Sequence, residues 1–270
     1  MALRALHTAT TGMRAQTLNI DVISNNLANV TTTGFKRQRV DFQDLLYQQV
    51  QRAGVTLNDG QNNLRPVPIQ VGLGVKDVAT RRDFNKQGAL ENTEQQLDIA
   101  IEGQGFFKIK VLDNQAPEGF AFSRDGSFTV DPNGNVVTSQ GYFLEPQITI
   151  PENTVQVNIS IDGRVEALQQ NQQQAQQVGQ IQLSTFRNPE GLLAIGDNLY
   201  IQTEASGNEQ QATPGDQGVG ILRQGFLEQS NVDVVQELVD MIEAQRAYEV
   251  NGNSIQTADE MLRLANNLRR

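Results

Sequence analysis

Apolar side chains recur every seven residues at both ends of the chain. A seven-residue apolar repeat is typical of a coiled-coil seam. All eight prolines lie between residues 66 and 214, so both ends are free of this helix breaker. The pattern predicts one helix over about residues 2–30 and a second from about Asn231 or Asp233 to Asn267. The residues predicted to pack these helices, also between subunits, are Leu6, Met13, Ile20, Leu27, Leu238, Met241, Tyr248, Ile255 and Leu262.

The middle of the chain has the period-two alternation of β-strands. Residues 98–102 and 106–111 alternate on either side of Gly103-Gln104-Gly105, which predicts two strands and a tight turn. Residues 127–130 and 136–138 flank a segment with Pro132 and Gly134, which predicts a hairpin.

Residues 31–75 are polar and lack a sustained period, so they are expected to form an extended arm. The predicted fold class is α+β. Long N- and C-terminal helices form an α-helical coiled-coil layer, joined by an extended β arm to a mainly β outer domain. The predicted ranges are 1–30 for the first helix, 31–75 for the arm, 76–227 for the β domain and 228–270 for the second helix.

Composition narrows the classes of function. The net charge of −10 argues against nucleic acid and against an anionic membrane surface as partners. The chain has no cysteine, so disulfides and cysteine-ligated zinc are excluded. No apolar run is long enough for a membrane span, and the N-terminus lacks the apolar core of a signal peptide. The protein is expected to be cytosolic, or to be exported without a cleaved signal.

The two ends carry opposite charge. Residues 1–40 have five basic side chains and one aspartate, and residues 228–270 have eight acidic side chains and four arginines. Ordinary solvated helix faces explain this as well as an attraction between the two helices does.

Few residues could carry chemistry. The single histidine, His7, has no marked nucleophile or acid beside it, and a packing or surface role is expected. The segment Asp131–Asn135 has oxygen spacing like a calcium loop, but it lacks the downstream bidentate acid. Glu237, Asp240 and Glu243 are expected to be solvated or paired with arginine. We expect no catalytic residue, cofactor or metal.

Several motifs resemble those of bacterial flagellar axial proteins, the rod and hook family. Residues 23–36 are similar to the family's N-terminal signature, whose key residues here are Ser24, Asn25, Asn26, Leu27, Ala28, Asn29, Gly34 and Phe35. Residues 101–107, 123–128 and 141–144 resemble its β-domain motifs, and residues 225–233 and 243–249 its C-terminal signature. Thr31 or Thr32 stands where the family more often has asparagine, and His7 where it commonly has a larger aromatic residue.

Within the family, the chain is most similar to distal rod subunits. Its length, its closing residues 251–262 and a polar stretch over residues 46–66 point that way. The resemblance implies that this stretch packs between neighbouring subunits and stiffens the polymer; a disordered linker is the alternative. The residues that mark this stiffness segment are Leu46, Gly54, Asp59, Gly60 and Pro66.

The resemblance also implies a function. The subunit would leave the cell through the flagellar type III export apparatus and form a helical homopolymer in the periplasm-spanning basal body. There it would be a rigid, hollow drive shaft that carries motor torque to the hook. Its neighbours would be proximal rod proteins, hook-side proteins and the bushing formed by the P and L rings, with no membrane insertion.

Three alternatives stay open from the sequence. The chain could be a proximal rod subunit, or a secreted β-domain binding module with an oligomerising coiled coil. A hydrolase that uses carboxylates of the β domain is a weaker alternative.

Overall fold

The computed structural model describes residues 2–51, 67–111, 119–170, 172, 174–216 and 218–267. The chain divides into two compact units. We call the first, Met1–Leu27 with Gln38–Arg81 and Val234–Arg270, the helical unit. The second, Ala28–Arg37 with Arg82–Asp233, is the β unit. The chain therefore passes between the units four times, and the predicted ranges did not anticipate that residues 28–37 group with the β-strands.

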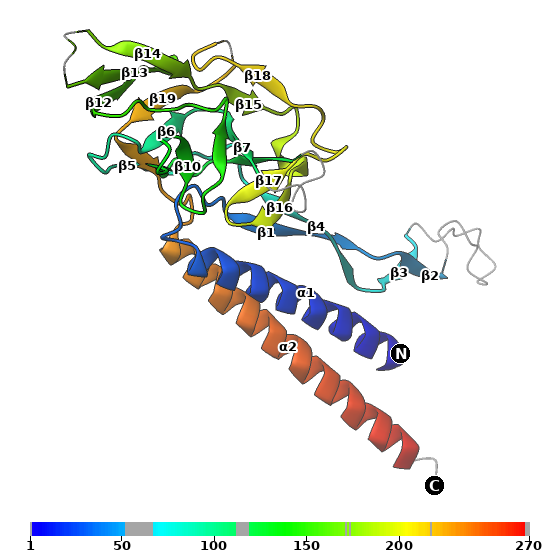
Figure 1. Ribbon diagram of the computed structural model, residues 1–270. Helices are drawn as coiled ribbons and strands as arrows, with labels where there is room; N and C mark the ends of the chain where they lie inside the picture. The colour runs from blue at the N-terminus through cyan, green and yellow to red at the C-terminus, as the bar shows by residue number, and fades with distance from the viewer. Residues whose placement is uncertain are drawn as a thin grey trace. The chain divides into compact units, whose positions relative to one another are not determined.

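Two antiparallel helices form the body of the helical unit (Figure 1). They are α1 (Ala2–Ala28) and α2 (Val234–Asn267), which confirms the two predicted helices. Two contacts fix their register: Asn26 bonds to Glu237, and Gly12 lies against the side chain of Asn251. The two contacts are separated by fourteen positions on α1 and by fourteen positions on α2, so the register between the helices is the same over two heptads.

Small side chains occupy four of the buried helix positions, alongside Val22, Ile23, Asn26 and Glu237. Ala9, Ala15, Ala244 and Ala258 are all at most 7% exposed. The large apolar residues of the predicted seven-residue repeats lie beside them and are only partly buried or exposed. The helix pair thus packs closely along small residues and leaves much larger apolar surface outside.

The described residues of the predicted arm after Arg37 contribute to two β-ribbons in the helical unit. The first pairs β1 (Gln38–Asp44) with β4 (Val75–Arg82), and the second pairs β2 (Tyr47–Gln51) with β3 (Ile69–Gly72) in antiparallel fashion. The ribbons meet α1 through Thr11, whose hydroxyl accepts a hydrogen bond from the Val75 amide at 3.3 Å.

Short strands in several sheets build the β unit (Figure 1). The largest sheet has nine strands in the order β16-β17-β8-β7-β11-β10-β9, and β15 joins β7 to β18. Three smaller sheets pair β12-β13-β14, β19-β6 and β20-β5. The strand bounds are β5 (Leu90–Asn92), β6 (Ile99–Glu102), β7 (Phe106–Lys110), β8 (Phe120–Ser123), β9 (Phe128–Val130), β10 (Val136–Thr138), β11 (Phe143–Glu145), β12 (Thr154–Ile159), β13 (Arg164–Gln169), β14 (Gln176–Gln180), β15 (Leu183–Thr185), β16 (Leu193–Gly196), β17 (Leu199–Ile201), β18 (Gln210–Ala212), β19 (Ile221–Gln224) and β20 (Phe226–Glu228), with a short 3-10 helix at Pro189–Gly191.

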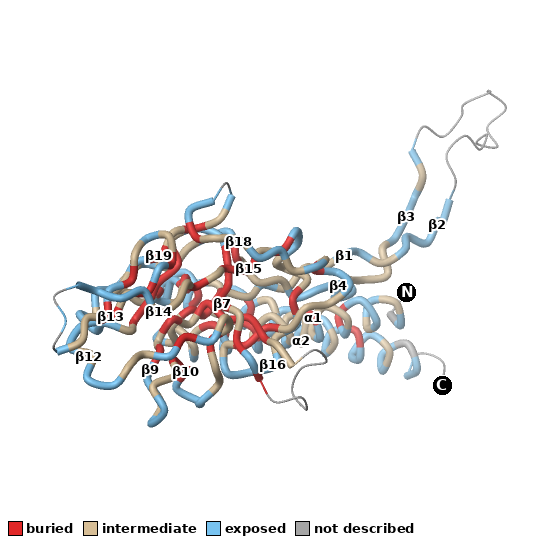
Figure 2. The backbone as a smooth tube through the Cα atoms, turned by 45° about the horizontal axis from the view of Figure 1, so that its top comes forward, coloured by how far each residue is buried: buried red, intermediate tan, exposed pale blue. Residues whose placement is uncertain are grey.

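The apolar core of the β unit lies among these strands, where the buried backbone gathers in Figure 2. Its main cluster extends along the chain from Ile99 to Leu222 and includes Phe107, Leu144 and Leu183, each at most 1% exposed. A second cluster of aromatic rings includes Phe84, Phe106 and Tyr200. Strand residues therefore supply the core, but successive residues of β6, β8 and β10 are buried, so these strands are covered on both faces and their burial does not alternate.

Two predicted turns are confirmed. Strands β9 and β10 pair in an antiparallel hairpin across the proline- and glycine-containing segment. Gly103 and Gly105, with φ of 113° and 141°, lie between β6 and β7. Only glycine adopts such backbone angles at little cost, which explains the Gly-Gln-Gly spacing.

Candidate assembly surface and a buried ionic cluster

An apolar stripe faces outward on the first turns of α2. Val235, Leu238, Val239 and Ile242 are spaced i, i+3, i+4 and i+7, which places them on one face of the helix. Their exposed fractions are 71%, 44%, 46% and 49%. This outward stripe lies on the side of α2 away from Glu237 and Ala244, which are buried. A stripe of this kind usually marks a surface that another chain covers.

The nine residues predicted for helix packing are all accessible in the single subunit. Leu238 and Tyr248 are exposed, at 44% and 39%. The remaining seven are each partly buried: Leu6, Met13, Ile20, Leu27, Met241, Ile255 and Leu262. Of these, Met241, Ile255 and Leu262 lie on the same helix as the outward stripe. Their role between subunits stays a prediction.

The predicted stiffness segment is described only in part. Leu46 is 85% exposed, and Tyr47 and Val50 on the following strand are 56% and 47% exposed. Gly54, Asp59, Gly60 and Pro66 lie outside the described residues.

The family-motif residue Asn26 joins three segments of the helical unit. Its side-chain amide donates to the backbone oxygen of Gln38 at 2.8 Å and accepts from the Gln38 amide at 2.9 Å. The same amide nitrogen donates to Glu237 Oε2 at 3.1 Å. Asn26 and Glu237 are 1% and 0% exposed. The Glu237 carboxylate is therefore buried against α1 and not solvated.

A second polar cluster lies in the β unit, around Lys36, Arg124 and Glu228. Lys36 Nζ donates to Glu228 Oε1 at 2.7 Å and to the backbone oxygen of Lys86 at 3.0 Å. Arg124 Nε lies 3.1 Å from Glu228 Oε2 as an ion pair, but the angle is outside hydrogen-bond range. The exposed fractions of Lys36, Glu228 and Arg124 are 0%, 1% and 4%. We call these three residues the ionic cluster.

Backbone groups complete the ionic cluster. Arg124 donates through Nη1 and Nη2 to the carbonyl oxygens of Gly103 and Gly105, at 2.7 to 2.9 Å. Glu228 Oε1 also accepts from the Gly88 amide at 3.0 Å. The glycine loop between β6 and β7 therefore presents carbonyl oxygens to a cation, which is the opposite polarity to a phosphate-binding loop.

The family-motif residue Gly34 fits closely beside Arg124. Its φ is 68°, and a Cβ built there would lie 2.8 Å from the backbone carbon of Arg124. Its amide donates to the backbone oxygen of Glu228 at 2.7 Å. Both the backbone angle and the space require glycine at this position.

The Asn231 side chain forms hydrogen bonds to the adjoining segments. Its side-chain oxygen accepts from the Arg37 amide at 2.7 Å, and its nitrogen donates to the backbone oxygens of Asp83 and Lys86 at 2.9 Å. The sequence predicted that the second helix begins near Asn231 or Asp233. Helix α2 begins at Val234, and the Asn231 side chain bonds within the β unit.

Burial changes the acid–base properties of the cluster. Desolvation, with a smaller contribution from repulsion by Arg124, lowers the pKa of Lys36, although the ion pair with Glu228 opposes this. Burial also lowers the pKa of Arg124, again against the attraction of Glu228. At Asp125, next in the chain, burial raises the carboxyl pKa although Ser127 donates hydrogen bonds to it. These shifts reflect a dry site with one carboxylate for two cations.

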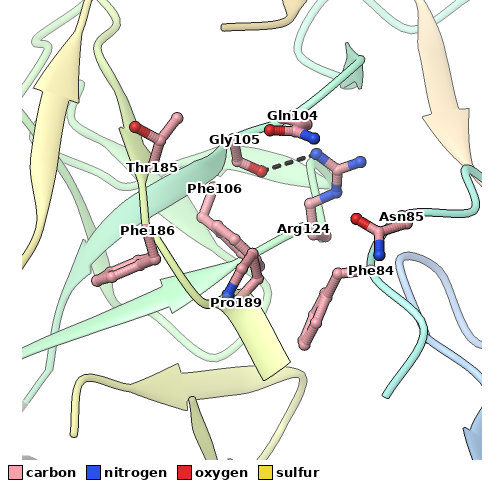
Figure 3. A pocket seen from close by; sticks show the side chains of 9 residues that line it. All are labelled: Phe84, Asn85, Gln104, Gly105, Phe106, Arg124, Thr185, Phe186 and Pro189. Atoms are coloured by element: carbon pink, nitrogen blue, oxygen red, sulfur yellow. Dashed lines mark hydrogen bonds between the residues drawn. The ribbon is translucent and has the colours of Figure 1, made fainter. Parts of the chain in front are cut away.

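A small cavity of about 20 Å³ lies beside Arg124, lined also by Phe84, Gln104, Phe106 and Phe186 (Figure 3). That volume accommodates about one water molecule. The guanidinium at its edge bonds to Gly105, as Figure 3 shows. The cavity is too small for an organic substrate.

The other candidates for chemistry have structural surroundings. His7 is exposed, and its Nδ1 lies 3.2 Å from the backbone oxygen of Leu73. Asp131 accepts hydrogen bonds from the amides of Asn133 and Asn135, as expected for the side chain that closes a hairpin turn. Among the described residues, no group of three or more His, Cys, Asp or Glu side chains is arranged to hold a metal ion.

Sequence reasoning did not assign a site role to Lys36, Arg124, Glu228 or Asn231. Each lies inside one of the motif segments that carry the family resemblance. The sequence feature that could have identified them is their position in those motifs. No local pattern shows that residues so far apart in the chain contact one another.

Comparison with known families covers both ends and the β unit. Residues 6–36 match the family model described as "Flagella basal body rod protein", and residues 100–167 match "Flagellar hook protein FlgE/F/G D1 domain". Residues 223–268 match "Flagellar basal body rod FlgEFG protein C-terminal". The three matches coincide with the segments that form α1, part of the β unit and α2.

Similar proteins match along the whole chain. "Flagellar basal-body rod protein FlgG" of Borreliella burgdorferi is 49% identical over 270 residues, 99% of each chain. The protein of the same name from Caulobacter vibrioides is 47% identical, over 99% of this chain and all of the relative. The one from Bacillus subtilis is 39% identical over the same shares.

Helices built from both chain ends, an outward apolar stripe and these matches define a structural subunit of the bacterial flagellum. The chain belongs to the family of flagellar basal-body rod proteins. No helix in the described part of the chain is long and apolar enough to cross a membrane.

Proposed function

We propose that this protein is a subunit of the distal rod, a rigid hollow shaft that transmits motor torque to the hook. The observation that carries the proposal is the outward stripe of α2, together with relatives named as rod proteins over the full length of the chain. A structural polymer needs no catalytic centre, so the proposal includes no enzymatic activity.

The proposed polymer grows through the helical unit. Val235, Leu238, Val239 and Ile242 of one subunit contact helices of its neighbours, and the accessible residues of both seven-residue repeats border the same contacts. Contacts between unlike faces do not close into a dimer, so they continue into a helical tube. Covering this surface removes the apolar side chains from water, which favours assembly.

The variant Ile242→Asp tests the proposed contact. Ile242 is 49% exposed, so a carboxylate costs the isolated subunit little, but in a dry contact it costs several kcal/mol. Subunits with Ile242→Asp should keep the native circular dichroism spectrum and fail to form rods in electron micrographs. The control Gln256→Asp places the same carboxylate at an exposed position of α2 beyond the stripe. Normal rods from Ile242→Asp subunits would refute the contact.

The segment from Leu46 to Pro66 is proposed to stiffen the rod. An isolated two-stranded ribbon is marginally stable in water, and β2 is exposed at every position. Contact with neighbouring subunits would stabilise the ribbon and hinder the sliding that lets a tube bend. Deleting residues 46–66 should give curved or flexible polymers, measured as persistence length in micrographs. Straight rods of unchanged stiffness would identify the segment as a passive linker.

The proposed surroundings follow from membership of the family. The subunit leaves the cell through the flagellar type III export apparatus, without a cleaved signal peptide, and assembles in the periplasm. Its partners are further copies of itself, proximal rod proteins, hook-side proteins and the P- and L-ring bushing. Crosslinking of isolated basal bodies through introduced cysteines identifies these neighbours cleanly, because the chain has no cysteine of its own.

A further inference from the structure

Two segments from opposite ends of the chain meet in the β unit. They are Gly34–Arg37, which begins six residues after α1 ends, and Glu228–Asn231, shortly before α2 begins. The Gly34 amide donates to the Glu228 backbone oxygen at 2.7 Å, and the Arg37 amide donates to Asn231 Oδ1 at 2.7 Å. The Lys36–Glu228 bond joins residues 192 positions apart.

The charges of the ionic cluster make these segments depend on each other. Lys36 and Arg124 are both buried, and Glu228 is the carboxylate that contacts them both. Removing one partner of a buried ion pair leaves an uncompensated charge, which is strongly destabilising. Lys36 can therefore occupy its buried place only while Glu228 is present, and the burial of Arg124 needs the same carboxylate.

The apolar clusters of the β unit include neither segment. The main cluster begins at Ile99 and ends at Leu222. Phe35 and Val232 are buried, but the described hydrogen bonds and ion pairs of the two segments are polar contacts at the margin of that core. Opening of the segments can therefore occur as a local event that leaves the largest sheet folded and reaches only the last residue of β20, Glu228.

We propose that Lys36, Glu228 and Arg124 form a coincidence latch, through which Gly34–Arg37 and Glu228–Asn231 dock on the β unit only together. The three side chains act as positioning residues for the segments that adjoin the two helices. The biological consequence rests on the proposed function. Neither segment docks on the β unit until both ends of the chain are present. A partly exported chain then cannot present a docked N-terminal segment to a growing rod.

Hydrogen exchange on the full-length monomeric subunit tests the latch. Glu228→Gln keeps the shape of the side chain and leaves two buried cations without a counter-charge. Amides of both segments, including Gly34, Arg37, Gln229 and Asn231, should exchange about tenfold faster or more, while β7 and β8 keep their protection. Lys36→Met retains a neutral Arg124–Glu228 pair and should have a smaller effect. The control Glu152→Gln makes the same chemical change at an exposed site outside both segments.

A second experiment tests whether the effect is reciprocal, because a coupling between two sites acts in both directions. Gly34→Ala makes its change in the N-terminal segment, where its Cβ would meet the Arg124 backbone. The latch requires faster exchange in Glu228–Asn231 as well. If each variant loosens only its own segment, or if all strands lose protection equally, the latch is wrong. Should Glu228→Gln not fold, Lys36→Met and Gly34→Ala decide the same question. Because the subunit is monomeric in this experiment, failure of the latch leaves rod assembly untouched.

Discussion

At the scale of single residues, Asn26 shows what the family motif does physically. One side-chain amide satisfies the backbone of Gln38 in both directions and also donates to the buried Glu237 carboxylate. Aspartate has nearly the same shape but no amide donor. It would also place a second carboxylate against the first in a dry site.

We therefore expect Asn26→Asp to lower the free energy of unfolding of the helical unit by about 3 kcal/mol at neutral pH. Urea titration followed by helical circular dichroism measures this. The variant Asn253→Asp on α2 is the control, because Asn253 is exposed and should lose less than about 0.5 kcal/mol. Equal losses for the two variants would show that the Asn26 bonds contribute nothing specific.

Asp125 gives a prediction about pH. Burial raises its pKa above the ordinary value of 3.8, so between the ordinary and the raised value the folded protein binds more protons than the unfolded chain. Stability must then fall as pH rises through that window. The variant Asp125→Asn removes this titration, and the difference in unfolding free energy between wild type and variant should become less favourable to wild type with rising pH. A difference that stays constant as the pH is raised from 3.8 to neutrality would contradict the predicted sign.

At the scale of elements, the two helices differ in the space available for a side chain at their glycine positions. Gly252 lies within α2, and a Cβ added there would have no neighbouring atom within 4 Å, whereas a Cβ at Gly12 of α1 would lie 3.0 Å from Asn251 Nδ2. Alanine is preferred to glycine in a helix interior by about 1 kcal/mol. The close approach at Gly12 offsets this preference.

We expect Gly252→Ala to stabilise the helical unit by about 0.5 to 1 kcal/mol, and Gly12→Ala to give no gain or a loss. Thermal unfolding followed at a helical wavelength compares the two variants directly. An equal gain from both would mean that the helix pair does not pack closely at Gly12.

At the scale of the whole molecule, the chain passes between its units four times, and the ionic cluster lies on the β side of these passages. The β unit therefore consists of two separate stretches, 28–37 and 82–233. If the chain is cleaved between these two stretches, the hydrogen bonds of Lys36 and Arg37 help to keep them associated.

Limited proteolysis of the dilute monomer should remove most of both helices and cut within residues 38–81. In the monomer, no neighbouring subunit covers the exposed apolar faces and stabilises these elements. The peptide that contains residues 28–37 should nevertheless co-elute with the fragment 82–233 in gel filtration, because Lys36 and Arg37 hold it. With Glu228→Gln the peptide should separate. Uncut helices in a verified monomer would contradict the view that assembly stabilises them.

The sequence by itself determined the elements and their order. Proline-free ends with a seven-residue repeat predicted α1 and α2, period-two alternation predicted the strands, and Gly103-Gln104-Gly105 predicted a turn between two of them. These features are local: periodicity and backbone preference act within a few residues. The motif segments also pointed to the flagellar family, which the comparisons confirm.

Only the tertiary structure decided which faces and charges meet. It placed small residues such as Ala244 in the helix seam, buried Glu237 against Asn26, and brought Lys36, Arg124 and Glu228 together. A periodic pattern shows that a helix has an apolar face, but the partner of that face depends on the register between distant segments. A charged residue likewise reads as solvated in sequence, because its burial depends on a counter-charge that can lie 192 residues away.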